Sequence, residues 1–439
     1  MTEAVEITAL SYGPNAIGRL ASGKTVFVEG AAVGDVVEVE LTKEASKYAE
    51  GRVARIIEPS EARVTPACPY ASVCGGCSWM HVSYDAQLKA KRANVVNQLS
   101  RIGGYSAEEA EALVGACVAS KREVGYRNKL ELGVGTDAAG KFALGFHKAG
   151  EQTLTTPKTC LLAARGIEKA PGALRGALSF VQGKGDLGIF RVGVRRSVRT
   201  KETEIALWTP PSAFPRKIVA DTLQSALPHV TSIVRVMADP GKARKIKGVE
   251  ALYGRGNWSE NLAGFTFKIS APSFFQVNTA QAETMIQLVI EGLELDERSV
   301  VADLYCGAGT FTLPLSQVAE TVFAVESAAS SVRDLRRNIE NLDADIEVIG
   351  GDSARELPTL GELDALVVDP PRAGLAAGVA ESIAEAGPTR VAYVSCDPAT
   401  WARDVARLKA VGYDLIRATP VDLFPQTYHV ETVSILEKR

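Results

Sequence analysis

The feature that most constrains the fold of this chain is an apolar strand that runs into a glycine-rich turn and then a helix. The strand is Val300 to Leu304, and the turn Tyr305-Cys306-Gly307-Ala308-Gly309 follows it directly. A second β-branched run, Thr321 to Glu326, ends in an acid 23 residues after Asp303. Strands that alternate with helices build a parallel sheet, and ligands bind at the carboxyl ends of its strands. The sequence therefore predicts an α/β domain with a ligand site at this edge.

The spacing of the glycines indicates which ligand the turn holds. A dinucleotide-binding fold requires a third glycine, as G-x-G-x-x-G, but Thr310-Phe311-Thr312 follows Gly309. This argues against a nicotinamide-dependent oxidoreductase. A carboxylate at Glu326 can accept both hydroxyls of a ribose, and Asp303 adds an acid at the start of the turn. A nucleoside without a pyrophosphate fits this arrangement, and S-adenosylmethionine is the ligand we expect.

Three more apolar runs continue the alternation, at 346–352, 365–369 and 390–395. The last two expected strands, 413–423 and 430–436, are joined by a link too short for a crossover helix, which predicts an antiparallel pair. One run ends in Asp369 and another is followed by Cys396, while Glu431 lies near the start of the last strand. A cysteine at a strand end is either a nucleophile or a small apolar residue, and position alone leaves both open.

Residues 1–60 have a different pattern, with short alternating strands at 25–29, 36–41 and 51–57 separated by glycine turns. This predicts a small β-barrel of the OB type. Basic side chains are interspersed with Phe27 and Tyr48, which suits binding of a nucleic-acid strand. A solvated polar face on a generic β module is the alternative.

Three of the seven cysteines are close together, as C-x5-C-x2-C at Cys68, Cys74 and Cys77. Thiolates at this spacing can bind one metal centre, and the surrounding glycines let the backbone wrap it. A tetrahedral centre needs a fourth ligand. Cys160 is the best choice, because Cys117 lies in an apolar stretch. An iron–sulfur cluster and a structural zinc are both chemically possible.

The net charge of −3 means that any nucleic-acid contact depends on local basic patches. Runs at 121–129, 189–199 and 233–247 mix Arg and Lys with aromatic or amide side chains on a β-rich region, which predicts RNA or DNA contact. The N-terminus has no basic segment followed by an apolar one, and no run has the length of a membrane span. We therefore expect a cytoplasmic protein with no membrane partner, in a compartment where disulfides are rare.

Four segments together resemble the signature blocks of the RNA uracil-5-methyltransferase family: DLYCGAGTFTLPL at 303–315, DPPRAGL at 369–375, VSCDPAT at 394–400 and FPQTYHVETV at 424–433. The N-terminal region resembles a TRAM domain, and the cysteine cluster resembles the [4Fe-4S] site of the ribosomal-RNA branch. The resemblance implies a TRAM-like, RNA-binding barrel at 1–60 and a β-rich central RNA-binding domain with the cluster at 61–270. A Rossmann-like class I methyltransferase domain at 271–439 completes the α/β architecture.

The resemblance also implies the reaction and its residues. A methyl group passes from S-adenosylmethionine to C5 of a specific uridine in RNA, with 23S ribosomal RNA favoured and the T-loop uridine of transfer RNA as the alternative. Cys396 is implied as the nucleophile that adds to C6, and Glu431 as the base that removes the C5 proton. The implied donor or uracil pocket consists of Gln276, Tyr305, Glu326 and Asp369, and the implied cluster ligands are Cys68, Cys74, Cys77 and Cys160.

Two departures from the family pattern and one rival class remain. The segment after Cys396 reads Ala399-Thr400-Trp401, where the bulky aromatic either belongs to the core or shapes the RNA entrance. Thr310 stands where some members have Asn, so no donor contact is expected from it. A non-catalytic RNA-binding or assembly factor would not need the DPPR, SCDP and HVET blocks, which are intact here. RNA is the partner that the sequence implies, and no obligate protein partner is expected.

Overall fold

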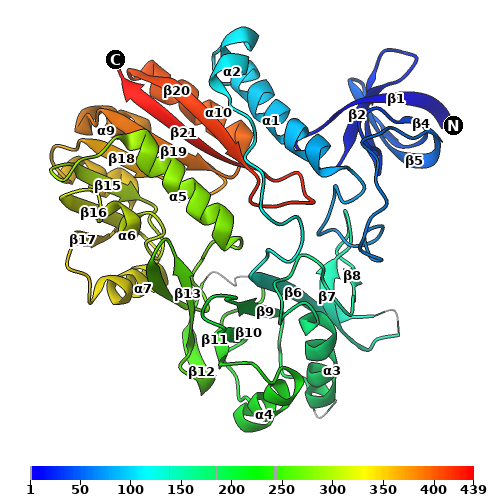
Figure 1. Cartoon of the computed structure of the whole chain (residues 1–439). Coiled ribbons are helices and arrows are strands. Elements are labelled where there is room, and N and C mark those ends of the chain that lie inside the picture. Colours follow the sequence, from blue (N-terminus) through cyan, green and yellow to red (C-terminus); the bar gives the residue numbers. More distant parts are fainter. Residues whose placement is uncertain (1, 138, 184, 242–244) are drawn as a thin grey trace. The chain divides into compact units, whose positions relative to one another are not determined.

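The computed structural model describes residues 2–137, 139–183, 185–241 and 245–439 (Figure 1). The chain divides into two compact units, which are described one at a time. The first consists of Met1–Glu123, Pro370–Ala384 and Ala392–Arg439, and the second of Val124–Asp369 and Glu385–Val391. The domain limits expected from the sequence, near residues 60 and 270, stay a prediction.

The first unit begins with a closed barrel in the strand order β1-β2-β3-β5-β4. Alternating side chains fill it, so that Val26 and Val28 are buried within one short strand. Gly18 lets two strands approach closely, because a Cβ atom there would lie 2.3 Å from Val5 Cγ1. The small β-barrel expected at 1–60 is confirmed. Its strands are β1 (Thr2–Leu10), β2 (Ala16–Arg19), β3 (Thr25–Glu29), β4 (Val36–Glu44) and β5 (Tyr48–Glu58).

The rest of the first unit consists of helices and strands from separate parts of the chain, including the C-terminus. Helix α1 packs against α2 and α10 (Figure 1). β20 and β21 pair antiparallel, as the short link predicts, in the strand order β19-β21-β20. The bounds are α1 (Tyr84–Arg101), α2 (Ala107–Leu113), α9 (Val379–Ala386), β19 (Arg390–Ser395), α10 (Pro398–Ala410), β20 (Tyr413–Val421) and β21 (Glu431–Lys438), and the first residues of β19 and the last of α9 belong to the second unit.

The second unit contains the alternating strands and helices predicted around the G-x-G turn. Its strands run parallel in the order β17-β16-β15-β18. The elements are α5 (Thr279–Leu293), β15 (Val300–Leu304), α6 (Thr312–Leu315), β16 (Thr321–Glu326), α7 (Ala329–Ile339), β17 (Asp345–Gly350), α8 (Ser353–Glu356), the 3-10 turn η1 (Leu357–Thr359) and β18 (Ala365–Val368).

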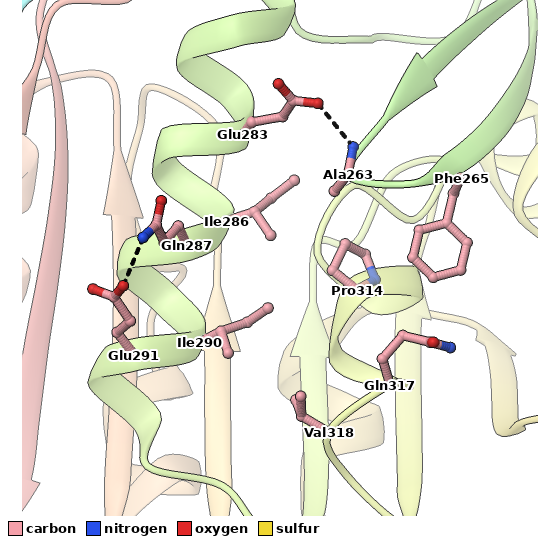
Figure 2. A pocket seen from close by; sticks show the side chains of 10 residues that line it. All are labelled: Ala263, Phe265, Glu283, Ile286, Gln287, Ile290, Glu291, Pro314, Gln317 and Val318. Carbon is pink, nitrogen blue, oxygen red and sulfur yellow. Dashed lines mark hydrogen bonds between the residues drawn. The ribbon is translucent and has the colours of Figure 1, made fainter.

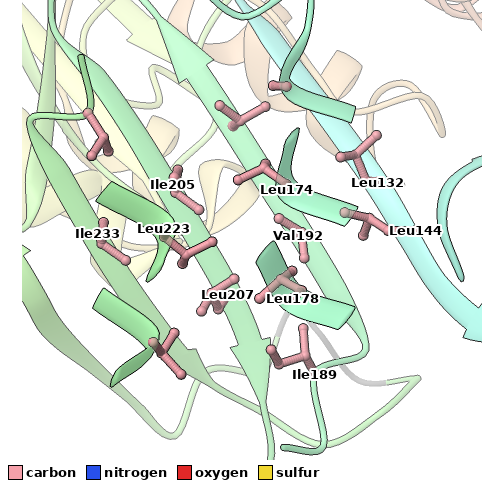
Figure 3. Close-up of a cluster of buried hydrophobic side chains, with 14 of the residues drawn as sticks. Leu132, Leu144, Leu174, Leu178, Ile189, Val192, Ile205, Leu207, Leu223 and Ile233 are labelled. Carbon is pink, nitrogen blue, oxygen red and sulfur yellow. The ribbon is translucent and has the colours of Figure 1, made fainter. Parts of the chain in front are cut away.

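The second unit also contains a β-rich sheet in the order β12-β11-β10-β9-β6-β7-β8. Leu174 and Leu178 of α3 and Leu223 of α4 pack on one face of it (Figure 3). Its elements are β6 (Lys129–Thr136), β7 (Phe142–His147), β8 (Leu154–Thr155), α3 (Ala170–Gln182), β9 (Arg191–Arg196), β10 (Thr203–Thr209), α4 (Arg216–Ala226), β11 (Ser232–Met237) and β12 (Gly248–Gly254), followed by the hairpin β13 (Asn257–Leu262) and β14 (Phe265–Ser270). Within the described ranges, no helix is long and apolar enough to cross a membrane.

Several cations of the basic runs are structural, which corrects the expectation that they face RNA. Arg195 is buried and pairs with Glu204 at 2.8 Å, and Arg235 is buried and donates to Thr209 Oγ1 at 2.7 Å. A charge removed from water needs such partners, so these side chains stabilise the sheet. Lys242 and Arg244 of the third run lie outside the described residues.

Candidate active site

The turn after β15 has a backbone that few residues can adopt. Tyr305 has a φ of +62°, Gly307 of +59° and Gly309 of +97°. A Cβ atom on Gly309 would lie 2.5 Å from Leu313 Cδ1, so no larger side chain fits there. A tyrosine in the left-handed region is strained, and such strain gathers at functional sites. The turn therefore holds its backbone N–H groups in a fixed arrangement.

The Glu326 carboxylate, at the end of β16, holds this turn. Its Oε2 accepts a hydrogen bond from the Gly307 backbone N–H at 3.0 Å, and its Oε1 accepts one from the Ala328 N–H at 2.6 Å. A carboxylate has about four lone-pair positions, so two further donors can still bind it. The geometry suits a ligand with two neighbouring hydroxyl groups.

Strand register places three predicted residues at one level of the sheet edge. Leu304 of β15 pairs with Val325 of β16 and with Val368 of β18. The residues that follow these three, Tyr305, Glu326 and Asp369, therefore leave the sheet together. The Asp369 backbone N–H donates to the Leu304 carbonyl at 3.3 Å, which fixes its position.

One buried carboxyl group, Asp303, and one half-buried carboxyl group, Asp369, lie at this edge. Burial raises the pKa of Asp369 to about 7. Burial also raises the pKa of Asp303 to about 7, and the nearby charges of Asp369 and Glu326 add to the rise, against a hydrogen bond donated by Thr312 Oγ1 at 2.6 Å. A carboxyl that keeps its proton near neutral pH can donate a hydrogen bond as well as accept one.

Gln276 is buried in the segment before α5, and Asn128, the residue before β6, anchors this segment. The Asn128 side chain donates to the Gln276 carbonyl at 2.9 Å, and the Asn128 backbone N–H donates to the Val277 carbonyl at 2.8 Å. Asn128, which the sequence suggested as an RNA contact, is thus a buried anchor. The role of the Gln276 side chain in the pocket stays a prediction.

Cys396, in the first unit, lies between the end of β19 and the first turn of α10. The residue after it, Asp397, caps the helix: its Oδ1 accepts from the N–H groups of Ala399 at 3.1 Å and Thr400 at 2.9 Å. The Asp397 backbone N–H donates to Ser395 Oγ at 3.2 Å. The residues on both sides of Cys396 are therefore fixed, and the thiol is half-buried.

Sequence reasoning missed Tyr12, which comes from the barrel and contacts this turn. Its hydroxyl donates to the Cys396 carbonyl at 3.0 Å. Its ring meets Tyr428 edge-on, with centroids 5.7 Å apart and planes at 89°. A lone tyrosine in a turn has no pattern in the sequence that would single it out.

Glu431 is the first residue of β21 and is buried, opposite Val421 of β20. The loop before it is held at Gln426, which has a φ of +71°. The Gln426 N–H donates to Gln87 Oε1 of α1 at 2.9 Å, and its carbonyl accepts from the Trp79 N–H at 3.1 Å. Glu431 therefore begins a strand, and the loop that leads to this strand is held by α1.

The cysteines of the predicted metal centre are all half-buried: Cys68, Cys74 and Cys77 in the first unit and Cys160 in the second. Among the residues that the structure describes, no group of three or more Cys, His, Asp or Glu side chains is placed to hold a metal ion. The thiol donor set suits a soft metal, but the described arrangement does not gather it. The described residues therefore do not show the metal cluster that the sequence predicted for the central domain.

A pocket of about 520 Å³ lies in the second unit between α5 and the β13–β14 turn (Figure 2). Ile286 and Ile290 of α5 point into it, and Pro314 and Val318 face them. The residues that line it include none of those predicted for the donor or the uracil. The candidate site is therefore defined by the turn and its carboxylates, rather than by this groove.

Comparison with known proteins agrees with these observations. The model of the family described as tRNA (Uracil-5-)-methyltransferase matches residues 242–439, and the TRAM domain model matches residues 2–54. An uncharacterized RNA methyltransferase of Gloeobacter violaceus is 35% identical over 100% of this chain and 96% of its own length. Another, of Clostridium tetani, is 35% identical over 98% of this chain and 95% of its own.

One solved structure is similar over almost the whole chain. It is the tRNA (uracil-54, C5)-methyltransferase of Pyrococcus abyssi in complex with S-adenosyl-L-homocysteine. It is 25% identical, with a TM-score of 0.74, and the similarity covers 98% of this chain and 99% of that one.

Proposed function

Since this chain belongs to the tRNA (uracil-5-)-methyltransferase family and is an S-adenosylmethionine-dependent RNA methyltransferase, we propose that it methylates C5 of one specific uridine through a covalent adduct with Cys396. The observation that carries the proposal is the position of this thiol, in a turn fixed by a helix cap and by the Tyr12 hydroxyl. A fixed nucleophile is what addition to a ring carbon requires.

The chemistry follows from the weak nucleophilicity of uracil C5. The Cys396 thiolate adds to C6, which leaves an enolate with its electron pair available at C5. S-adenosylmethionine supplies an electrophilic methyl group on a sulfonium. C5 attacks this methyl, and the sulfonium sulfur keeps the bonding electrons. Glu431 then removes the C5 proton, the C5–C6 double bond re-forms, and the thiolate leaves C6. The base is expected to be flipped out of its RNA, since the sulfur must reach one face of the ring.

The donor site is proposed to be the edge formed by Tyr305, Glu326 and Asp369, with Gln276. Glu326 would accept the ribose hydroxyls, because two backbone N–H groups already hold it in place. Tyr305 would cover the adenosine or the methionine part with its ring. Asp369, with a pKa near neutral, is suited to a hydrogen bond with a polar edge of the uracil.

The proposal also concerns which RNA is methylated. The cysteine pattern favours 23S ribosomal RNA, and the alternative is the T-loop uridine of transfer RNA. The similarity to the Pyrococcus abyssi tRNA (uracil-54, C5)-methyltransferase supports the alternative. Methyl transfer from labelled donor to separated ribosomal and transfer RNA decides between them, and mass mapping of 5-methyluridine in RNA from cells that lack the gene identifies the nucleotide.

The mechanism is tested with Cys396→Ala, using methyl transfer and a denaturation-resistant adduct with RNA that carries 5-fluorouridine. We expect both signals to disappear. Cys117→Ala is the matched control: burial raises the pKa of the Cys117 thiol to about 12, so it stays neutral and unreactive. Full activity of Cys396→Ala would refute the covalent mechanism.

We also propose that Cys68, Cys74, Cys77 and Cys160 bind a [4Fe-4S] cluster, with structural zinc as the alternative. The four thiols are donors of the type that binds such a cluster. Metal binding is coupled to local folding, so that a site of this kind is completed only when the metal binds. The methyl transfer needs no electron, so no step depends on the cluster. An absorption spectrum and metal analysis of anaerobically purified protein test this: bound zinc without a brown chromophore favours the alternative, and no metal at all contradicts both.

A further inference from the structure

We propose that Tyr12 of the barrel is a positioning residue for the reaction: its hydroxyl holds the backbone of the nucleophile Cys396, and its ring holds the segment that leads to Glu431. The inference rests on the proposed function, since it takes Cys396 as the nucleophile. It gives the barrel a part in the chemical step in addition to RNA binding.

Tyr12 is presented by a turn that is itself rigid. The turn joins β1 to β2, and Ser11 and Asn15 close it: the Ser11 N–H donates to the Asn15 carbonyl at 3.0 Å, and Ser11 Oγ donates to the same carbonyl at 2.5 Å. The Gly13 N–H donates to the Ser11 carbonyl at 2.8 Å. Because the turn is braced in this way, the direction of the Tyr12 side chain is set by the barrel.

The hydroxyl of Tyr12 acts on the residue that carries the chemistry. It donates to the Cys396 carbonyl at 3.0 Å, across 384 positions of sequence. The backbone on the other side of Cys396 is already fixed by the cap at Asp397 and by Ser395 Oγ. The bond from Tyr12 therefore restrains the peptide group of Cys396, which limits the positions that its Sγ can occupy.

The phenol can make this bond throughout the neutral pH range. Burial and the nearby charge of Asp397 raise the pKa of Tyr12 well above its usual value. The hydroxyl thus keeps its proton and stays a donor. A loss of activity after removal of the hydroxyl should accordingly be the same across neutral pH.

The ring of Tyr12 reaches the second reacting group by way of Tyr428, three residues before Glu431. The two rings meet edge-on at 5.7 Å, and the Tyr428 ring contacts that of His429 at a tilt of 40°, with centroids 4.2 Å apart. Tyr428 also packs against the hydrophobic core of the barrel, which includes Trp79. One side chain of the barrel thus touches both the turn of the nucleophile and the segment before the base.

The test compares Tyr12→Phe, which removes only the hydroxyl, with Tyr12→Leu, which also removes the ring. We expect Tyr12→Phe to lower the single-turnover rate of adduct formation at saturating RNA about fivefold, equivalent to about 1 kcal/mol for one neutral hydrogen bond, with KM for RNA and donor unchanged. Tyr12→Leu should lower it further. The matched control is Tyr413→Phe, which removes a hydroxyl bonded to the Ile383 carbonyl at 3.4 Å and should leave the rate unchanged.

The outcomes separate this inference from the proposed function. If the wild type forms an adduct and Tyr12→Phe matches it within twofold, the positioning role is refuted and the nucleophile stands. If Tyr12→Phe raises KM for RNA and leaves the rate alone, Tyr12 is an RNA contact and the inference is wrong. If the wild type forms no adduct, both fail. Rates are measured well below each variant's thermal transition, so that a loss of folded protein cannot imitate the effect.

Discussion

Lys91→Met should destabilise the first unit more than a Lys→Met substitution at an exposed ion pair destabilises the chain. Lys91 lies in the middle of α1, and its Nζ is 2.5 Å from Asp422 Oδ1 and 3.1 Å from the Phe424 carbonyl. Both side chains of the pair are 0% exposed. Replacing Lys91 with methionine therefore leaves a carboxylate buried and without its counter-charge.

The expected loss is large because removal of one partner of a buried pair costs about 3–5 kcal/mol. For a unit of this size, each 1 kcal/mol lowers the thermal midpoint by roughly 2–4 °C, so the transition of the first unit should fall by roughly 6–20 °C. Activity should fall as well, because Asp422 and Phe424 begin the segment that leads to Glu431.

The assay is thermal and urea unfolding of the full chain, with each transition followed separately because a chain of two units need not unfold in one step. Lys217→Met, at the exposed pair with Asp221, is the control and should shift no transition measurably. The double variant Lys91→Met/Asp422→Asn removes the stranded charge and should recover most of the loss. A loss below about 1 kcal/mol for Lys91→Met would refute the reasoning, as would a double variant no more stable than the single one.

Three further predictions follow from the site. Glu431→Gln should still form the adduct and transfer the methyl group but fail to release it, so that a methylated protein–RNA adduct accumulates on denaturing gels; normal turnover would assign the base to another group. Glu326→Ala should weaken binding of S-adenosylhomocysteine about ten- to a hundredfold by calorimetry, because the turn loses its clamp and the ribose its acceptor, and an unchanged Kd would place the ribose elsewhere. The carboxyl groups of Asp303 and Asp369 have a pKa of about 3.9 in the unfolded chain and about 7 in the folded one, so the folded state binds more protons between these values. The free energy of unfolding should therefore fall as pH rises from about 4 to about 7, by about 1.4 kcal/mol per pH unit for each group. Urea unfolding of the wild type and Asp369→Asn between pH 5 and 8 measures this, and equal slopes for the two proteins would contradict it.

Local patterns in the sequence were enough to predict several of the elements. The strand before Tyr305, the two glycines after it and the run that ends in Glu326 predicted a parallel sheet with its ligand edge, because strand period and backbone freedom are properties of neighbouring residues. The short link before β21 predicted the antiparallel pair for the same reason. The chemical residue types at these strand ends, including Cys396, were visible without any structure.

Two properties depend on tertiary contacts instead: which polar side chains are buried, and which distant segments meet. In the sequence, Arg195 and Arg235 resemble surface cations, but both are buried in the sheet. Glu204 of the paired strand and the distant Ile269 carbonyl bind Arg195, and Thr209 binds Arg235. Tyr12 had no signal at all, since its contact with Cys396 joins residues 384 positions apart. A local pattern records which conformations a segment favours, whereas burial and pairing depend on what the rest of the chain brings to it.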